Sequence, residues 1–304
     1  PAALPAGCGP FAGQPCGDGM SGQLISEVLE KDATGEIAHI YAEIRRLWGV
    51  PNVTTIVRHV ASVPGVLEWY WSIIRPANAC GDFQETALGM VDTLATEPLQ
   101  PLPDLALRAM GVDASAKAQI QDVYGAYDRN NRPNLLFVSI LQRLLRSATG
   151  KSKYEPQRTN WALPETARPL VRMVQADEMT PETLALAQAV GSWGFPEGSA
   201  FLPGVYRHLA NWPAYLAHVG ALMWPYLETG EILRAGTSIV AAADAVADEL
   251  VSRLPSAPEG LAAPTPEQAA SMSALLSTMT QKIPEMIVIC KLLGDALPGE
   301  EKGT

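Results

Sequence analysis

The amino-acid sequence repeats itself once, and this repeat restricts the folds that the chain can adopt. The segment RHVASVP at residues 58–64 has a counterpart, RHLANWP, at residues 207–213, which is an offset of 149. Two further pairs keep the same order: WGVP (48–51) with WGFP (193–196), and PNLLFV (133–138) with PEMIVI (284–289). Three matches at a nearly constant offset indicate two copies of one structural unit.

The matches divide the chain into five parts. We expect an N-terminal tail at residues 1–30, a first helical repeat at 32–148 and a second at 171–296. Residues 149–170 are polar and contain three prolines, which is typical of a linker. Residues 297–304 form a short C-terminal tail.

Within the copies the apolar residues follow a helical period. Residues 37, 40, 41, 44, 47 and 48 are apolar and share one stripe of an α-helix. Thr180 and Thr265 each precede Pro-Glu, a pattern typical of a helix start, and Asp113 is expected to cap a helix over 114–127. Most of the prolines are expected to separate helices rather than to interrupt them, and alternating strand patterns are missing.

The sequence therefore predicts an all-α protein of two tandem helical repeats. Each copy would expose a similar apolar face, and a contact between these faces would bury both, as in an isologous dimer. We expect such an intramolecular pseudo-dimer to have a shared central pocket lined by equivalent positions of the two copies.

Composition argues against several classes of function. The net charge is −10, and Lys/Arg-rich runs that would neutralise phosphates are missing, so nucleic acid is not expected as a partner. The most apolar long stretch, residues 235–251, contains three acidic residues, so a membrane span is not expected either. Because the N-terminus lacks the pattern of a signal peptide, we expect a cytoplasmic protein.

The four cysteines do not form a zinc-binding pattern, and we expect no metal and no cofactor. Cys80 and Cys290 lie in apolar stretches and are interpreted as reduced core thiols. Cys8 and Cys16 lie in a Pro/Gly/Ala-rich segment, where a loose tail is favoured over a disulfide bridge.

Several of these residues resemble a known family. The run from Gly35 through Arg75-Pro76, and YRHLANWPAYL at residues 206–216, are similar to the two halves of the group I (non-stereospecific) 2-haloacid dehalogenases. The resemblance covers most of residues 30–295. It implies a helical pseudo-dimer that hydrolyses the carbon–halogen bond of a small 2-halo acid with water activated by a carboxylate, without a metal.

The family positions can be transferred to this sequence one at a time. The catalytic aspartate stands directly before the Tyr-Arg pair, where this chain has Val205 next to Tyr206, with Gly204 at a position that can hold serine. Further pocket positions of the family fall on Asn52, Thr55, Cys80, Gln84 (or Glu85) and Asn131 (or Asn130). The resemblance thus implies a substrate-binding set from which the catalytic carboxylate is missing.

Two histidines are candidate replacements for that carboxylate. If residues 52 and 55 face the pocket, His59 lies on the same helical stripe, and His208 is its counterpart in the second copy. Histidine titrates near neutral pH and can act as a base or bind a carboxylate, although both could instead be buried histidines bonded to the backbone.

Arg58 and Arg207 form a second equivalent pair. An arginine fork can bind a carboxylate, but an ion pair between the two halves is the favoured interpretation. Cys80 is a candidate nucleophile, for which an inert buried thiol is the favoured alternative.

Three functions follow from these residues. The first is a diverged dehalogenase-like protein that binds or transforms a small organic acid in the pocket; if it is an enzyme, it is a hydrolase. The second is a non-catalytic binding or interaction protein on the same scaffold, and the third is a true 2-haloacid dehalogenase with another base. The chain could also pair with a second copy of itself.

Overall fold

The structure, a computed structural model, describes residues 26–91, 96–147, 153–158, 160–165, 168–193 and 202–297. The predicted tail cysteines, Cys8 and Cys16, lie outside the described residues, as do residues 298–304. The described part of the chain contains helices and no β-strand, which confirms the all-α prediction. None of its helices combines the length and the apolar character that a membrane span requires.

Eleven α-helices and one 3-10 helix make up the described residues. Their bounds are α1 (Gly35–Trp48), α2 (Thr55–Ser62), α3 (Val66–Ala79), α4 (Asp82–Gly89), α5 (Asp104–Ala109), α6 (Ala114–Leu144), η1 (Ala176–Glu178), α7 (Pro181–Gly191), α8 (Gly204–Leu209), α9 (Pro213–Glu228), α10 (Glu231–Arg253) and α11 (Pro266–Ala296).

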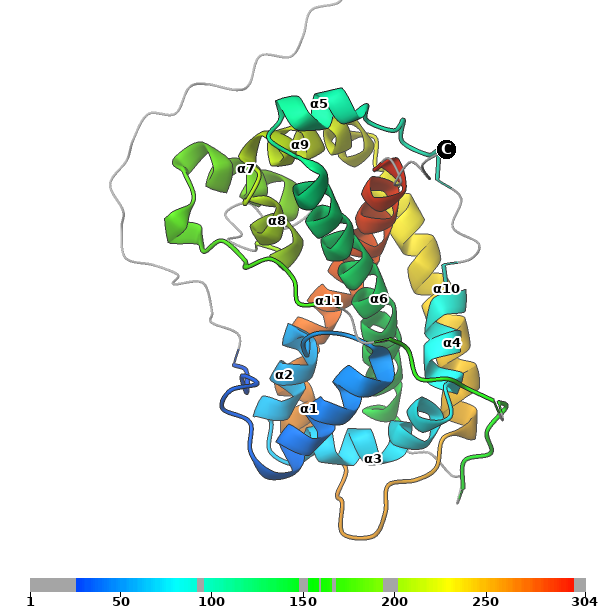
Figure 1. The fold of residues 1–304 in the computed structure, drawn as a ribbon. Helices are drawn as coiled ribbons and strands as arrows, with labels where there is room; N and C mark the ends of the chain where they lie inside the picture. The colour runs from blue at the N-terminus through cyan, green and yellow to red at the C-terminus, as the bar shows by residue number, and fades with distance from the viewer. Residues whose placement is uncertain are drawn as a thin grey trace, which may run out of the picture.

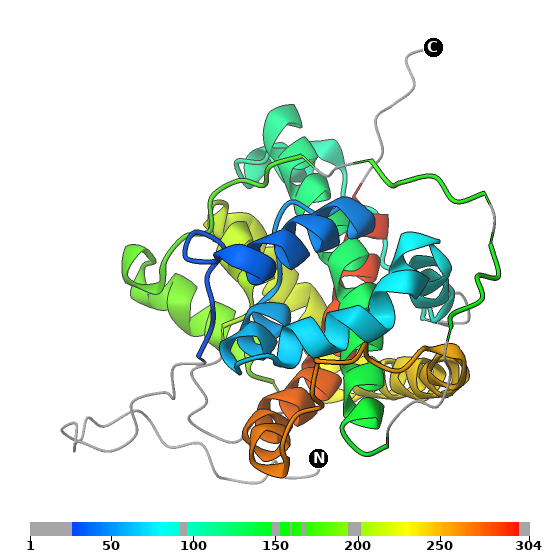
Figure 2. The same cartoon turned by 90° about the horizontal axis from the view of Figure 1, so that it is seen from below.

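We call residues 26–147 the first half and residues 168–297 the second half. The short α2 and α8 begin 149 residues apart, and the 31-residue helices α6 and α11 begin 152 residues apart. Figure 1 shows α1, α2 and α3 at one end of the molecule and α7, α8 and α9 toward the other, with α6 running between them. In the view from below, α1, α2 and α3 lie in front of α6 (Figure 2).

The two long helices connect the halves. α6 packs along α11, and both pack against α10. α6 of the first half also contacts α8 of the second, whereas α11 of the second half contacts α2 of the first. This reciprocal crossing brings the starts of α2 and α8 to the same pair of long helices.

The helix starts follow the capping residues in the sequence. Thr180 and Thr265 accept hydrogen bonds from the N–H groups of Thr183 and Gln268, at 3.2 and 3.3 Å, which confirms both predicted caps. Asp113 accepts from the N–H of Ala116 at 2.8 Å. α6, however, continues to Leu144, well beyond the predicted end at residue 127.

The prediction that proline separates helices was wrong at four places. Pro76, Pro133, Pro225 and Pro284 lie inside helices, and they form two equivalent pairs. An internal proline removes one backbone hydrogen bond and crowds the preceding turn. In α6 the residues that follow Pro133 are almost fully buried, and this burial outweighs the lost bond.

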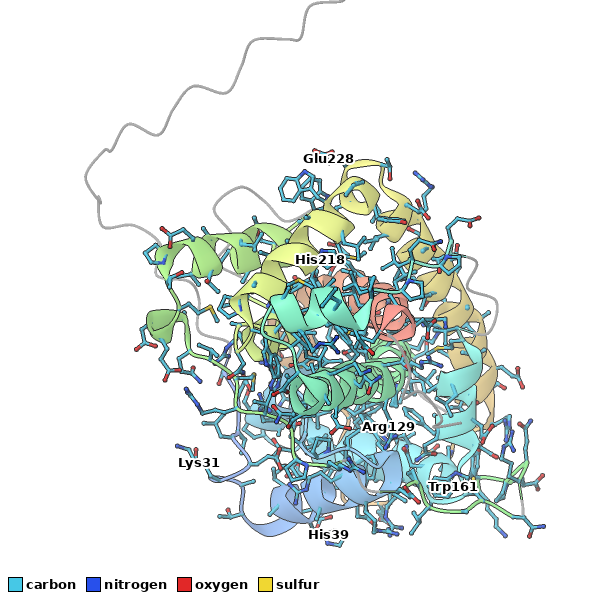
Figure 3. The ribbon with its side chains drawn as sticks, turned by 45° about the horizontal axis from the view of Figure 1, so that its top comes forward. Lys31, His39, Arg129, Trp161, His218 and Glu228 are labelled. Atoms are coloured by element: carbon cyan, nitrogen blue, oxygen red, sulfur yellow. The ribbon has the colours of Figure 1, made fainter. Side chains whose placement is uncertain are left out.

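Residues 26–30, expected in the N-terminal tail, instead pack on α2. The N–H of Val28 donates to the carbonyl of Arg58 at 3.0 Å, and the Tyr41 hydroxyl donates to the carbonyl of Val28 at 2.9 Å. The predicted linker also packs on the first half. The Trp161 ring fills the space beside Gly81, whose φ of +86° favours glycine, and Figure 3 shows this ring beside the helices of the first half.

Candidate functional site

A cavity of about 280 Å³ lies where the two halves meet. It is lined by the segment before α2, the starts of α2 and α8, the middle of α6, the middle of α11, and two residues of the segment that precedes α7. Its polar and charged lining residues are Asn52, Thr54, Thr55, Arg58, Tyr127, Asn130, Asn131, Asn134, Arg207, His208 and Lys282.

α6 presents an amide face to this cavity. Asn130 and Asn131 are adjacent, each lies about one helical turn before Asn134, and all three are almost fully buried. Asn134 accepts a hydrogen bond from the hydroxyl of Thr54 at 2.8 Å. Asn130 Oδ1 and Asn131 Nδ2 have no hydrogen-bond partner among the described residues. Buried amides without partners cost free energy, so a polar ligand or water is expected to bind them.

α8 contributes Gly204, Arg207 and His208, which are spaced by three and four residues and so share one helix face. His208 is 5% exposed, and its Nδ1 has no hydrogen-bond partner among the described residues. Burial lowers the pKa of His208, and the charge of Arg207 lowers it further, against an opposing effect of the Val171 backbone. The imidazole is therefore neutral at pH 7, the form that can accept a proton.

Tyr127 joins α6 to this face of α8. Its ring meets the His208 ring edge-on, with centroids 5.8 Å apart at an interplanar angle of 73°. A Cβ atom at position 204 would overlap the Tyr127 hydroxyl, so a larger residue there requires Tyr127 to move. Burial raises the pKa of Tyr127, which keeps the hydroxyl protonated at neutral pH.

Three cationic side chains line the cavity, and two of them have carboxylate partners. Arg58 Nε donates to Glu27 at 2.7 Å. Lys282 Nζ donates to Glu285 at 2.7 Å and to the carbonyl of Trp193 at 2.5 Å. Burial lowers the pKa of Lys282 and raises that of Glu285, while their mutual attraction opposes both shifts. No carboxylate lines the cavity in the part of the chain that the structure describes, so the cavity suits an anion.

Four residues predicted from the sequence line the cavity: Asn52, Thr55, Asn131 and His208. His59, the counterpart of His208, does not line it, because its Nδ1 contacts the carbonyl of Ser26 at 2.8 Å. The stripe that included His59 assumed a helix from residue 52. α2 begins only at Thr55, so Asn52 is not part of that stripe, and only Thr55 and His59 share a face of this helix.

Val205 and Tyr206 were expected in the pocket, but neither is among its lining residues. Both are 0% exposed and belong to the core, because α8 turns its Gly204, Arg207 and His208 face toward the cavity instead. Tyr206 leaves its hydroxyl without a hydrogen-bond partner in the described residues. Gly204, and not Val205, is thus the residue that faces the pocket, and neither residue carries a carboxylate.

Cys80 and Gln84 also lie away from the cavity lining. Gln84 Nε2 donates to the carbonyls of Leu47 and Asn78, at 3.1 and 3.2 Å, which fixes the turn between α3 and α4. Burial raises the pKa of the Cys80 thiol, which disfavours the thiolate that a nucleophile needs. Arg58 pairs with Glu27 of its own half, so the predicted ion pair between the halves was wrong at this arginine.

The sequence interpretation did not identify Tyr127 and Lys282 as site residues. Tyr127 precedes Asn131 by four residues, and this spacing would have placed it on the amide face if the helix had been extended past residue 127. Lys282 is the counterpart of Asn131 at the offset of 151 that relates the Pro133 and Pro284 segments. The repeat could therefore have identified it.

The chain is similar in sequence to two curated 2-haloacid dehalogenases. It is 26% identical over 258 residues to a configuration-inverting 2-haloacid dehalogenase from Alcaligenes xylosoxydans xylosoxydans, over 83% of this chain and 82% of that protein. It is 25% identical over 218 residues to an (R)-2-haloacid dehalogenase from Rhizobium sp. (strain NHG3), over 68% of this chain and 80% of that protein. Neither description names a non-stereospecific enzyme, and no family model matches the chain.

Solved structures of D-2-haloacid dehalogenases share the fold. A mutant in complex with D-2-CPA matches with a TM-score of 0.64 at 19% identity, over 91% of this chain and 96% of that one. A complex with L-LA matches with a TM-score of 0.62 at 20% identity and the same coverage. The sequence relatives and structural neighbours are thus 2-haloacid dehalogenases, which supports a dehalogenase-like scaffold for this chain.

Proposed function

We propose that this chain is a diverged 2-haloacid dehalogenase-like protein whose cavity binds a small organic acid. The observation that carries the proposal is the cavity lining: the partnerless polar atoms of Asn130, Asn131 and His208, together with cationic side chains and no described carboxylate. A carboxylate ligand supplies the negative charge and the acceptor atoms that this lining lacks.

The two halves are proposed to be related by an approximate twofold axis that passes near the cavity. Equivalent positions line it from both sides: Thr55 with Gly204, Arg58 with Arg207, and Asn131 with Lys282. The reciprocal contacts of α6 with α8 and of α11 with α2 support this arrangement. Pairing with a second copy of the chain stays a prediction of the sequence.

If the protein turns over a 2-halo acid, we assign His208 as the base. It is neutral at pH 7, lies in the cavity and has a buried nitrogen that no described residue bonds. The neutral imidazole would take a proton from water as the water oxygen forms a bond to C2. The halide leaves with the electron pair of the carbon–halogen bond, and the product is a 2-hydroxy acid.

Halide release from (R)- and (S)-2-chloropropionate tests this assignment, with calorimetric binding of both acids measured alongside. We expect His208→Gln to lose about 10²- to 10⁴-fold in rate, the usual effect of losing a general base. The matched control is His59→Gln, which changes the counterpart histidine outside the cavity and should retain the rate. Equal rates in the two variants would contradict the assignment. The resemblance to non-stereospecific enzymes predicts that both enantiomers react.

The pH profile gives an independent test of His208. A histidine base must be neutral to accept a proton, so kcat/KM falls when the pH drops through the pKa of this histidine in the free enzyme. Because burial and Arg207 hold the pKa of His208 below its usual 6.5, we expect the acid limb of the profile below pH 6.5. An acid limb above pH 7 would point to another base.

A non-catalytic binding protein is the second candidate function. Gly204 and Val205 stand where the resemblance places a serine and the catalytic aspartate, and this absence of a carboxylate favours binding without turnover. Micromolar to millimolar binding of 2-chloropropionate without halide release above a buffer control would establish this function. Halide release that survives His208→Gln would instead indicate a true dehalogenase with another base.

A further inference from the structure

The two cavity-lining arginines occupy equivalent positions, and the segments beside them keep a common register. The N–H of Val28 donates to the carbonyl of Arg58 at 3.0 Å, and the N–H of Val174 donates to the carbonyl of Arg207 at 3.0 Å. Val174 is thus the counterpart of Val28. In this register Met173 is the counterpart of Glu27.

The side-chain partners of the two arginines differ in charge. Arg58 pairs with the carboxylate of Glu27 at 2.7 Å, and the side chains of both residues are 20% exposed. Arg207 bonds only neutral groups among the described residues: the carbonyl of Val174 at 3.3 Å and the side-chain amide oxygen of Gln175 at 2.5 Å. Met173 stands at the register position of Glu27, where it offers no carboxylate, and it also lines the cavity.

Arg207 therefore carries a positive charge that the described protein groups do not compensate. Lys282, the other cation on the second-half side, is paired with Glu285. A partly buried guanidinium without a counter-ion is unfavourable, and its planar fork matches the two oxygens of a carboxylate.

We infer that Arg207 binds the carboxylate of the organic acid, in the place that the Glu27 counterpart would otherwise take. Arg58 has the structural role of fixing residues 26–30 on α2, whereas Arg207 is the specificity-determining residue for an anionic ligand. This inference rests on the proposed function of the same cavity.

The sharpest test restores the missing carboxylate. In Met173→Glu, the new side chain should pair with Arg207 as Glu27 pairs with Arg58, and it should compete with the ligand. We expect the affinity for 2-chloropropionate to fall about 10- to 100-fold, the equivalent of one charge-assisted hydrogen bond or two. The unfolding midpoint in urea should stay at or above that of the wild type. Met173→Gln, of similar size but neutral, should cause a clearly smaller loss.

A second readout separates charge recognition from a structural effect. The wild type should bind propionate at least about tenfold more tightly than propionamide, because only the acid meets the charge of Arg207. In Arg207→Gln and in Met173→Glu this ratio should approach one. Arg172→Gln is the matched control. Arg172 directly precedes Met173 and is an exposed cation that pairs with Glu178, so its loss should leave the acid-to-amide ratio at the wild-type value.

The outcomes distinguish the two levels of the proposal. If the wild type binds none of these acids, the proposed function fails. If it binds them and Arg207→Gln and Met173→Glu keep both the affinity and the acid-to-amide ratio within about twofold of the wild type, the inference about Arg207 alone is overturned. A loss of affinity with an unchanged ratio would also overturn it, because it would show a structural effect.

Discussion

Gly204 has no side chain, and the Tyr127 hydroxyl fills the space beside its backbone in the cavity wall. The Tyr127 hydroxyl lies where a Cβ atom would stand, and the ring carbon Cζ would be 3.4 Å from that atom, an ordinary contact. The clash therefore depends on one oxygen atom. Gly204 and Tyr127 form a steric pair that neither residue shows by itself.

This pair makes a prediction for Gly204→Ala. The variant should lose about 1 to 3 kcal/mol of unfolding free energy, because overpacking forces Tyr127 out of place. Adding Tyr127→Phe removes the oxygen, and the double variant should recover most of the loss. Urea unfolding of the wild type, both single variants and the double variant gives the coupling energy. Additive effects of the two substitutions would contradict the clash.

At this scale the sequence predicted some site residues and missed others for definable reasons. Asn131 was found through the family resemblance, and His208 through the helical spacing and the internal repeat. Tyr127 was missed because its role depends on a contact with residue 204, which is 77 positions away. His59 and His208 look alike in sequence, and only their tertiary contacts separate them: His59 Nδ1 contacts the carbonyl of Ser26, whereas His208 lines the cavity.

At the scale of elements, the two long helices α6 and α11 line the cavity with different chemistry. α6 supplies amides, whereas α11 supplies Met279, Ile283 and Met286 at helical spacing, with Lys282 among them. The cavity thus has an amide wall and an apolar wall. At about 30 Å³ for each non-hydrogen group, its 280 Å³ hold about nine such groups, more than a three-carbon halo acid contains.

We therefore expect affinity to rise with chain length. Each methylene added to 2-chloropropionate should improve Kd about threefold to fourfold for the first two or three, because it is buried against the α11 wall. Calorimetric titration of a series from three to seven carbons checks this. Met286→Trp should lower the ratio of the six-carbon to the three-carbon affinity by filling that wall. A wild-type affinity that is flat or falls with length would contradict the argument.

The existence of the helices was predictable from the sequence, but their ends were less so. The caps at Thr180 and Thr265 are local, so the sequence alone identifies them. The continuation of α6 through Pro133 is not local. It depends on the burial of the following apolar residues against other helices, which compensates for the bond that proline removes.

At the scale of the whole molecule, one buried carboxylate is a central contact of the segment between the halves. Asp82 is 3% exposed and accepts hydrogen bonds from the Tyr154 hydroxyl at 2.6 Å, from the N–H of Gln157 at 2.8 Å and from Arg253 at 3.1 Å. Burial alone would raise the pKa of Asp82, but these donors outweigh it and lower the pKa. The cluster connects α4, the interhalf segment and the end of α10.

Asp82→Asn should therefore destabilise the protein by about 1 to 3 kcal/mol, because Arg253 loses its charged partner and the donors lose a full acceptor. Chemical unfolding measures this loss. Asp244→Asn is the control. Asp244 pairs with Arg143, but its side chain is 49% exposed, so this variant should lose less than about 1 kcal/mol of unfolding free energy.

The contribution of Asp82 to stability should also depend on pH. Since the pKa of Asp82 is lowered in the folded state, its contribution is present at neutral pH. It is lost as the pH falls below 3.8, and this loss should be absent in Asp82→Asn. Equal losses in the two variants at neutral pH would contradict a special role for Asp82.

The sequence by itself determined the helical class, because helical periodicity and capping depend on neighbouring residues. The correspondence between its two parts stays a prediction of the sequence. The tertiary structure decided which candidates line the cavity, namely His208 and not His59, and Gly204 and not Val205. It also decided that Arg207, of the two lining arginines, has no described carboxylate partner. The physical reason is that orientation and charge compensation depend on residues far apart in the chain. Arg58 is compensated by Glu27 and Gly204 is constrained by Tyr127, and neither contact has a local signal.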